Sequence, residues 1–242
     1  ADYIVHLAGE NIGDKRWTAK RKAAIIDSRE QSVKLIYSAL ENNNKKLDAF
    51  VSASGIGIYG AVNGVEICTE DSPPANDFLG DTCQKWEAAA DTIAALQIRT
   101  VKIRTGLVLG KEGGFLEKLV PIFKLGLGAA LGSGKQYMPW IHIDDLCLVY
   151  YEAIVNKNMV GPYNAAVEDD TTNIIFSKTL ARVLGYSLWL PNVPSFLLKL
   201  GLGEMARIVL SGRRISCDKI ENTGFEFQYK NLELALKDCL DK

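Results

Sequence analysis

A few residues in this sequence have types and positions that could do chemistry. The stretch YIVHLAG ends in Ala8 and Gly9, and small residues after a strand allow a dinucleotide to approach the backbone closely. Alternatively, Gly9 serves a turn. Arg29 can hold a phosphate group through two parallel hydrogen bonds, or can be a solvated residue on a helix face. Arg104 can bind an anionic substrate or pair with a carboxylate. Each of these residues therefore keeps two open interpretations.

Histidines and cysteines do not indicate a metal centre. The sequence has only two histidines, His6 and His142, and no CxxC spacing. Its cysteines are scattered and odd in number: Cys68, Cys83, Cys147, Cys217 and Cys239. We therefore expect no metal site, and reduced thiols in a cytoplasmic protein.

Composition excludes several classes of partner. The 242 residues are 48% hydrophobic and 24% charged, as in a globular protein, and the formal net charge is −1. A net charge so close to zero predicts no nucleic-acid partner, and no apolar run reaches the length of a membrane span. Composition therefore favours neither a nucleic acid nor a membrane as partner.

Alternating strands and helices must position these residues. Apolar or β-branched runs predict strands at residues 3–7, 49–54, 99–104 and 161–165. Helical patterns lie between or after them, at residues 19–42, 80–96, 114–125, 143–156 and 172–184. The alternation predicts an α/β fold with a doubly wound parallel sheet.

The pattern changes near residue 190. We divide the chain into an α/β domain at residues 1–189 and a small α+β module at residues 190–242. In the module, an apolar helix is expected over residues 195–211, a half-buried strand over 224–229 and an amphipathic helix over 232–240. The pair Arg213 and Arg214 is expected to face solvent.

Several motifs in a fixed order point to one family. They are HLAGENI, Trp17 with Asp27-Ser28-Arg29, VSASGIGIYG, KWEAAA, IRTGLVLGKEGG, LGSGKQYMPWIHIDDL, and LGEMARIVLSGRR followed by GFEFQY. In this order they resemble the NAD(P)-dependent epimerase family proteins, which are atypical extended short-chain dehydrogenases/reductases. The subgroup carries a small C-terminal domain of unknown function. The resemblance covers essentially the whole chain and implies a Rossmann-like fold.

The resemblance also implies an element ahead of Ala1. Family members begin with a strand and a GxxGxxG turn that receives the cofactor pyrophosphate. No such motif occurs in this sequence, and HLAG resembles the fourth sheet strand of the family. We therefore expect the first three strands of the sheet to be missing from this chain.

By resemblance, the cofactor is NADP, although NAD is an alternative. Leu7 and Ala8 would then lie along its adenosine and ribose, with Gly9 beside them. Arg29 and Ser52 would lie near the cofactor, and Val108 would contact it through its backbone.

Ser54 is the best candidate for the catalytic hydroxyl that holds the reacting oxygen, and Ser52 is the second. In the alternative interpretation these serines only touch nicotinamide or water.

The family's usual proton donor is replaced. Active members carry YxxxK on the helix after the catalytic serine, where the lysine lowers the pKa of the tyrosine. Counting back from Glu87 puts Leu79 at the tyrosine position and Cys83 at the lysine position. Tyr59 is a candidate replacement donor, or a packing residue in a turn.

The segment GSGKQYMPWIH resembles the part of sugar-nucleotide epimerases that lines the substrate pocket. Lys135, Gln136, Trp140 and His142 are its candidate substrate-binding residues, together with Arg104. His142 is equally well interpreted as a buried, hydrogen-bonded residue near a helix start.

Two functions stay open. The first is an NADP-dependent oxidoreductase or epimerase-like protein acting on a small carbonyl, alcohol or sugar-like substrate. The second is a catalytically silent protein that senses NADPH or binds a partner, which the replaced Tyr-Lys pair favours. A homodimer is a further expectation.

Overall fold

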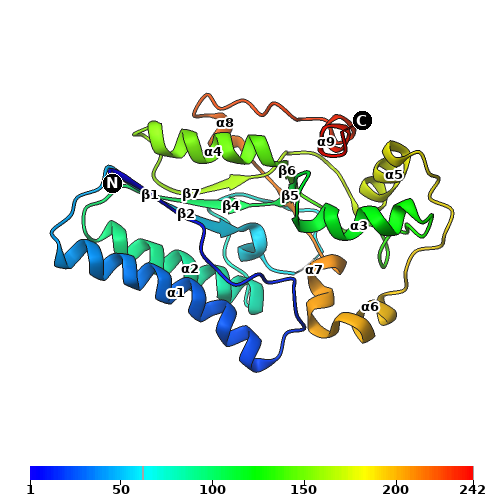
Figure 1. Cartoon of the computed structure of the whole chain (residues 1–242), viewed down its shortest axis with the longest axis horizontal. Helices are drawn as coiled ribbons and strands as arrows, with labels where there is room; N and C mark the ends of the chain where they lie inside the picture. Colours follow the sequence, from blue (N-terminus) through cyan, green and yellow to red (C-terminus); the bar gives the residue numbers. More distant parts are fainter. Residues whose placement is uncertain (62, 242) are drawn as a thin grey trace.

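The structure is a computed structural model that describes residues 1–61 and 63–241. At its centre lies a parallel sheet with the strand order β1-β2-β4-β7. The strands are β1 (Tyr3–His6), β2 (Ala49–Gly55), β4 (Thr100–Thr105) and β7 (Gly161–Ala165). Figure 1 shows α1 (Ala19–Asn42) and α2 (Phe78–Ala94) on one face and α4 (Ile143–Val155) on the other. The predicted doubly wound α/β sheet is confirmed.

Burial explains the composition of the central strands. Val51 of β2 and Val101 and Ile103 of β4 are fully buried, as expected for parallel strands covered on both faces. The register pairs Ser54 with Arg104 on the neighbouring strand. The carboxyl ends of β2 and β4 therefore bring two predicted site residues side by side.

The two long helices begin at side-chain caps. The Thr18 side chain accepts a hydrogen bond from the Arg21 N–H at the start of α1, and Asp77 accepts one from the Gly80 N–H at the start of α2. Such caps satisfy backbone donors that the helix itself leaves free. The Asp77 cap sets where α2 begins, and so which of its residues reach the strand ends.

Two short parallel ladders lie beside the main sheet. One pairs β5 (Leu107–Leu109) with β6 (Trp140–His142), and the other pairs β3 (Ile67–Cys68) with β8 (Arg214–Ile215). A 3₁₀ turn, η1 (Ile56–Tyr59), follows β2, while α3 (Gly114–Lys124) and α5 (Asn173–Leu184) lie at the carboxyl-end side. These short elements and the loops between them surround the carboxyl ends of the main-sheet strands.

The helix expected over residues 195–211 is broken into three parts. They are α6 (Ser195–Leu202), η2 (Gly203–Met205) and α7 (Ala206–Leu210). Gly203 has a φ of 62°, a left-handed conformation that ends α6 and that glycine adopts readily. The break turns α7 away from α6, and residues 207–213 then run along the strand ends.

The prediction of a strand over residues 224–229 is wrong. The segment pairs with no strand, and the backbone N–H groups of Gln228 and Tyr229 instead donate to the Asp145 carboxylate at 2.8 and 3.0 Å. Phe225, Phe227 and Tyr229 alternate with polar residues because their side chains are the more buried ones, although the backbone forms no β-sheet hydrogen bonds with another strand. The flanking helices are α8 (Asp218–Glu221) and α9 (Leu232–Cys239).

The C-terminal residues share the main core. Ile215, Phe227 and Leu236 belong to the same buried cluster as Val51 and Val101. The division at residue 190 stays a prediction. Among the described residues, no helix has the length and apolar character needed to cross a membrane.

Candidate functional site

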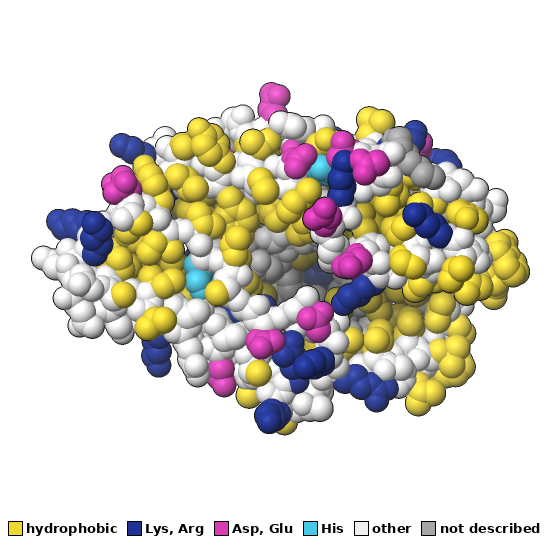
Figure 2. Space-filling view, in the orientation of Figure 1, with side chains coloured by type: hydrophobic (Ala, Val, Ile, Leu, Met, Phe, Trp, Pro, Cys, Tyr) yellow, Lys and Arg dark blue, Asp and Glu magenta, His cyan; other side chains and the backbone are white. Residues whose placement is uncertain are grey.

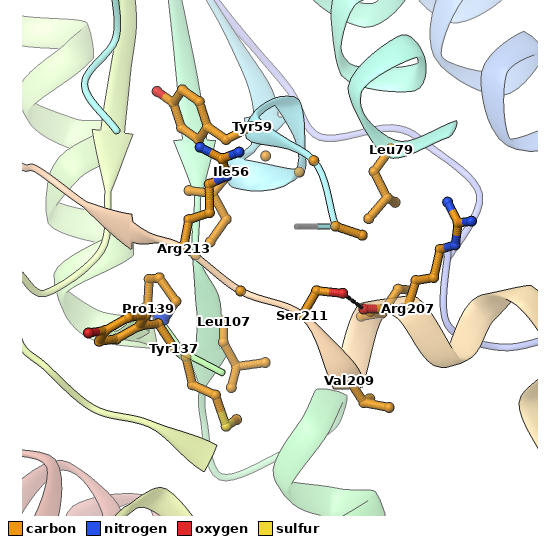
Figure 3. A pocket seen from close by; sticks show the side chains of 18 of the residues that line it. Ile56, Tyr59, Leu79, Leu107, Tyr137, Pro139, Arg207, Val209, Ser211 and Arg213 are labelled. Atoms are coloured by element: carbon orange, nitrogen blue, oxygen red, sulfur yellow. Dashed lines mark hydrogen bonds between the residues drawn. The ribbon is translucent and has the colours of Figure 1, made fainter. Parts of the chain in front are cut away.

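A cavity of about 380 Å³ opens at the carboxyl ends of β2 and β4. Its walls come from η1, the first turns of α2, the start of β5 and the segment 207–213. Figure 2 shows the hollow near the centre of this face, and Figure 3 shows the lining side chains. Its volume falls in the range of small-molecule sites, and the carboxyl ends of parallel strands are where α/β sheets bind ligands.

Part of the cavity wall is bare backbone. Gly55, Gly57 and Gly106 all line it. A Cβ added at Gly106 would lie 2.8 Å from the Pro139 carbonyl oxygen, so a side chain cannot be added there without moving the neighbouring loop. Bare backbone leaves room for a flat ring to lie close to the strand ends.

The wall contributed by α2 is apolar at the two positions that counting back from Glu87 assigns to the expected Tyr-Lys pair. Leu79 and Cys83 lie one turn apart and both line the cavity. A Cβ on Gly57 would lie 3.5 Å from Leu79 Cβ and 3.6 Å from Cys83 Sγ. Burial raises the pKa of the Cys83 thiol to about 12, so it stays protonated at neutral pH. This wall therefore offers no general acid or base.

Ser54 and Arg104 belong to a buried polar cluster behind this wall. The Ser54 hydroxyl donates to Glu87 Oε1 at 2.7 Å, and Arg104 donates to both Glu87 oxygens at 2.8 and 2.9 Å. All three residues are less than 9% exposed, and none lines the cavity. Of the two predicted roles of Arg104, the structure shows pairing with a carboxylate.

Tyr59 belongs to the same buried polar cluster. Its hydroxyl donates to Asn164 Oδ1 at 2.7 Å and accepts from Arg104 Nη1 at 2.9 Å. Burial is the main reason that the pKa of Tyr59 is raised to about 12. We call Ser54, Tyr59, Glu87, Arg104 and Asn164 the Glu87 network. Tyr59 also lines the cavity, but its hydroxyl is already committed on both sides, as a packing residue's would be.

The structure brings Gly9 and Arg29 together. A Cβ on Gly9 would lie 3.0 Å from Arg29 Cζ, so a side chain there would press on the guanidinium. Arg29 stacks over the Trp86 ring at 4.5 Å, and its Nη1 donates to the Glu10 and Ile25 carbonyls. Its Nε is buried without a partner. Burial lowers the Arg29 pKa from its ordinary value.

The other predicted cofactor residues lie outside the cavity. Leu7 and Ala8 are exposed just beyond β1. Ser52 is buried within β2, where its hydroxyl donates to the Ala53 carbonyl at 3.0 Å, and Val108 lies half-buried in β5. None of these four residues lines the cavity. Their predicted contacts with a cofactor stay predictions.

Among the predicted substrate residues on the segment from 132 to 142, one lines the cavity. Gln136 does so, and its Nε2 donates to the Leu131 and Val209 carbonyls. Lys135 is exposed outside the cavity lining. Trp140 is fully buried and donates from Nε1 to Asp169.

His142 is also buried outside the cavity lining. Its Nδ1 accepts from the Asp144 N–H at 3.2 Å, and its ring stacks on Tyr229 at 3.8 Å. The structure therefore shows the second of its two predicted roles, a buried residue at a helix start. Asp144 and Asp238 lie close enough to His142 to form a set of potential metal ligands, but both carboxylates are exposed.

Sequence reasoning missed the arginines of the 207–213 segment. Arg207 and Arg213 both line the cavity, so the expectation that Arg213 only faces solvent is wrong. Arg214 instead pairs with Asp170 at 2.8 Å. A signal was available in Gly212, where a Cβ would lie 1.9 Å from the Tyr137 carbonyl oxygen. This close approach packs the segment against the Tyr137 backbone, and Tyr137 and Arg213 both line the cavity.

Comparison with known proteins bears out the family. Residues 1–166 match the NAD dependent epimerase/dehydratase family, and residues 193–239 match a domain of unknown function, DUF1731. Epimerase family protein YfhF of Bacillus subtilis is 35% identical over 240 residues, which are 99% of this chain and 78% of that protein. A chloroplastic SDR39U1 homolog of Arabidopsis thaliana is 36% identical over 236 residues, covering 97% of this chain and 67% of that protein.

Solved structures agree with the sequence matches. Human epimerase family protein SDR39U1, crystallised with NADPH, superposes with a TM-score of 0.92 at 31% identity, covering 100% of this chain and 82% of that one. A nucleoside-diphosphate sugar epimerase from Corynebacterium glutamicum gives a TM-score of 0.78 at 31% identity, over 99% of this chain and 46% of that one. The chain therefore belongs to the NAD dependent epimerase/dehydratase family.

Proposed function

We propose that this chain binds NADP(H) at the carboxyl ends of its sheet and exchanges a hydride with a small carbonyl compound or alcohol in the cavity. The observation that carries the proposal is the cavity itself, with its bare wall at Gly55, Gly57 and Gly106. It lies at the strand ends of a fold that matches the human NADPH-bound relative over the whole chain. The sequence match to the family supports the same cofactor class.

The residues present fit a nicotinamide ring and one phosphate group of a dinucleotide, whereas the GxxGxxG turn that receives the pyrophosphate in the family does not occur in this sequence. The Arg29 guanidinium lines the cavity and is held in place by two carbonyls and by the Trp86 ring, so its charge can attract a phosphate group there. The bare backbone at Gly55 and Gly57 suits the flat face of a nicotinamide ring. When bound, the cofactor supplies the hydride.

Proton supply is the unusual part of this proposal. The apolar pair Leu79 and Cys83 cannot deliver a proton to the reacting oxygen, and the hydroxyl of Tyr59 is committed to Asn164. We propose that the proton comes from water at the open mouth of the cavity. Ser54, which donates to Glu87, then acts by positioning the end of β2.

The same apolar pair favours a second function. A protein that binds NADPH without turnover, as a sensor or a partner of another protein, needs no proton donor. Leu79 and Cys83 in place of the Tyr-Lys pair are the observation that supports this alternative.

The first test is a calorimetric titration with NADPH, with the human protein as positive control. We expect one equivalent to bind. A Gly57→Val variant should lose binding, because its added methyl groups meet Leu79 and Cys83 in the cavity wall. Gly64→Val is the matched control, since a Cβ there meets open space. No binding by this chain, or equal binding by Gly57→Val, would contradict the proposal.

The second test separates the two functions. NADPH oxidation is followed spectroscopically with a panel of small aldehydes and ketones. Turnover that Gly57→Val abolishes and Gly64→Val retains supports the oxidoreductase. Tight NADPH binding without turnover across the panel supports the silent protein.

A further inference from the structure

The charged side chains of the described cavity wall are all positive. Among the described residues, the lining contains three arginines, Arg29, Arg207 and Arg213, and neither a lysine nor a carboxylate. Arg29 lies on the α1 side beside Gly9, whereas Arg207 and Arg213 come from the 207–213 segment. Figure 3 shows Arg207 and Arg213 on either side of Ser211. The side of the wall formed by residues 207–213 is therefore cationic, with no carboxylate among the described lining residues.

Arg207 and Arg213 also differ from every other arginine in their partners. Arg104, Arg182 and Arg214 donate to carboxylates, as does Arg21, while Arg16, Arg29 and Arg99 donate to backbone carbonyls. In the described part of the chain, neither Arg207 nor Arg213 has an oxygen acceptor for its guanidinium. Arg213 reaches only the Cys68 sulfur, at 3.7 Å, and its Nε is buried without a partner. These two lining arginines therefore keep guanidinium donors that no described protein oxygen accepts from, and such donors are available to an anion.

The rest of the wall does not suit a sugar. Its side chains are mainly apolar, among them Ile56, Leu79, Leu107, Met138, Val209 and Ile215. The polar ones are largely engaged with the protein: Thr82 donates to the Phe78 carbonyl, Gln136 to two carbonyls and Ser211 to the Arg207 carbonyl. Among the described lining side chains, Gln136 Oε1 and Trp86 Nε1 are buried without a partner, so the free polar groups besides the arginines are few for a sugar with several hydroxyls.

We infer that the cavity takes a small organic oxyacid, with an apolar body against the aliphatic wall and an anionic head on Arg213, with Arg207 at the rim. A carboxylate or a phosphate monoester offers the required chemistry, since each accepts hydrogen bonds from a guanidinium. The inference rests on the proposed function, because it names the substrate class of the same cavity.

The test uses three probes with one shared apolar body. They are phenylbutanoate, its methyl ester and phenylpropyl phosphate, each titrated into the chain alone and into the NADPH-saturated chain. We expect the two anions to bind the NADPH-saturated chain, and the neutral ester to bind at least about tenfold more weakly. Which anion binds more tightly identifies the head group.

Variants locate the head group. Arg213→Met, which keeps the length of the side chain, should weaken anion binding at least about tenfold, and exposed Arg207→Met by about threefold. Arg182→Met is the matched control, because Arg182 pairs with Glu233 outside the cavity lining. Arg213→Lys keeps the charge, so its affinity for the anions should lie between that of the unchanged chain and that of Arg213→Met. If Arg213→Met does not fold, Arg207→Met and Arg213→Lys decide the question.

Four results would overturn the inference. They are equal binding of acid and ester, unchanged anion affinity in the folded arginine variants, no binding of any probe, and displacement of NADPH by the anion. The last would assign these arginines to the cofactor. Anion binding that depends on Arg213 but occurs without any NADPH binding would refute the proposed function, and only the assignment of the cavity as an oxyacid site would stand.

Discussion

Two polar regions meet at the carboxyl ends of the sheet, and they differ in how their charges are satisfied. In the Glu87 network, the hydroxyls of Ser54 and Tyr59 and the Arg104 guanidinium all find protein partners within 3 Å. On the 207–213 segment, the guanidiniums of Arg207 and Arg213 have no oxygen partner among the described residues, yet they line the same cavity. One region is closed on itself and the other is open to a ligand.

This difference separates scaffold from site. A buried polar group that is fully hydrogen-bonded stabilises one arrangement of the elements around it, here β2, β4, α2 and η1. A cation that faces a cavity without a partner is available to an incoming anion. Arginines therefore have two roles in this chain: Arg104, which pairs with Glu87, stabilises the fold, whereas Arg207 and Arg213, which have no oxygen partner among the described residues, are available to a ligand.

The largest expected effect comes from breaking the closed region. Arg104→Met leaves the Glu87 carboxylate buried with its bidentate partner removed, and we expect unfolding to become easier by about 3–5 kcal/mol. Urea unfolding measures this loss. Lys85→Met, which removes an exposed ion pair with Asp81, is the control and should change little. A loss no larger than the control's would contradict a structural role for the network.

A second, smaller effect tests how the C-terminal segment is attached. Asp145→Asn weakens the buried acceptor for the Gln228 and Tyr229 N–H groups, and we expect a loss of about 1–3 kcal/mol. Hydrogen exchange should speed up at these two amides before the central strands respond. Uniform acceleration over the whole chain would argue against a local anchor.

The variant Ser54→Ala tests whether the Ser54 hydroxyl is structural or catalytic. If the hydroxyl only supports Glu87, its removal costs about 1 kcal/mol of unfolding free energy and leaves NADPH affinity and any turnover nearly unchanged. If Ser54 is the catalytic hydroxyl, turnover is lost while stability changes little. Measuring stability and turnover on the same preparation distinguishes the two roles.

The smallest expected effect is a pH dependence at β1. Burial, with a contribution from the Arg29 charge, lowers the pKa of His6, so the folded chain binds its proton less readily than the unfolded chain. The stability that neutral His6 contributes is therefore present above the unfolded value near 6.5 and is lost as the pH falls below it. His6→Gln should flatten this decline in urea unfolding between neutral and mildly acidic pH. An identical decline in the variant would exclude His6 as its source.

The sequence predicted the layers of the fold well, because buried parallel strands and long helices leave strong local patterns. α1 begins and ends at the expected residues, and β7 does too. The segment 224–229 misled because side-chain burial alternates there although the backbone bonds to Asp145 rather than to a strand. Local alternation cannot tell these two cases apart.

The site was harder to predict for the same reason. Ser54 and Arg104 lie at the expected strand ends, but their partner Glu87 comes from α2, and only the fold brings it to them. Arg213 reaches the cavity because Gly212 packs against the Tyr137 backbone, a contact between segments far apart in the sequence. The predicted replacement of Tyr and Lys by Leu79 and Cys83 does place both residues on the cavity wall.

The most direct test of the division between closed and open arginines is an NMR spectrum of the arginine Nε–H groups. Arg104 Nε donates to Glu87, whereas the Nε groups of Arg29 and Arg213 are buried without a partner. We predict that NADPH shifts the Arg29 signal, that phenylbutanoate then shifts the Arg213 signal, and that the Arg104 signal stays in place. Movement of Arg104 with Arg29 and Arg213 unchanged would contradict the account.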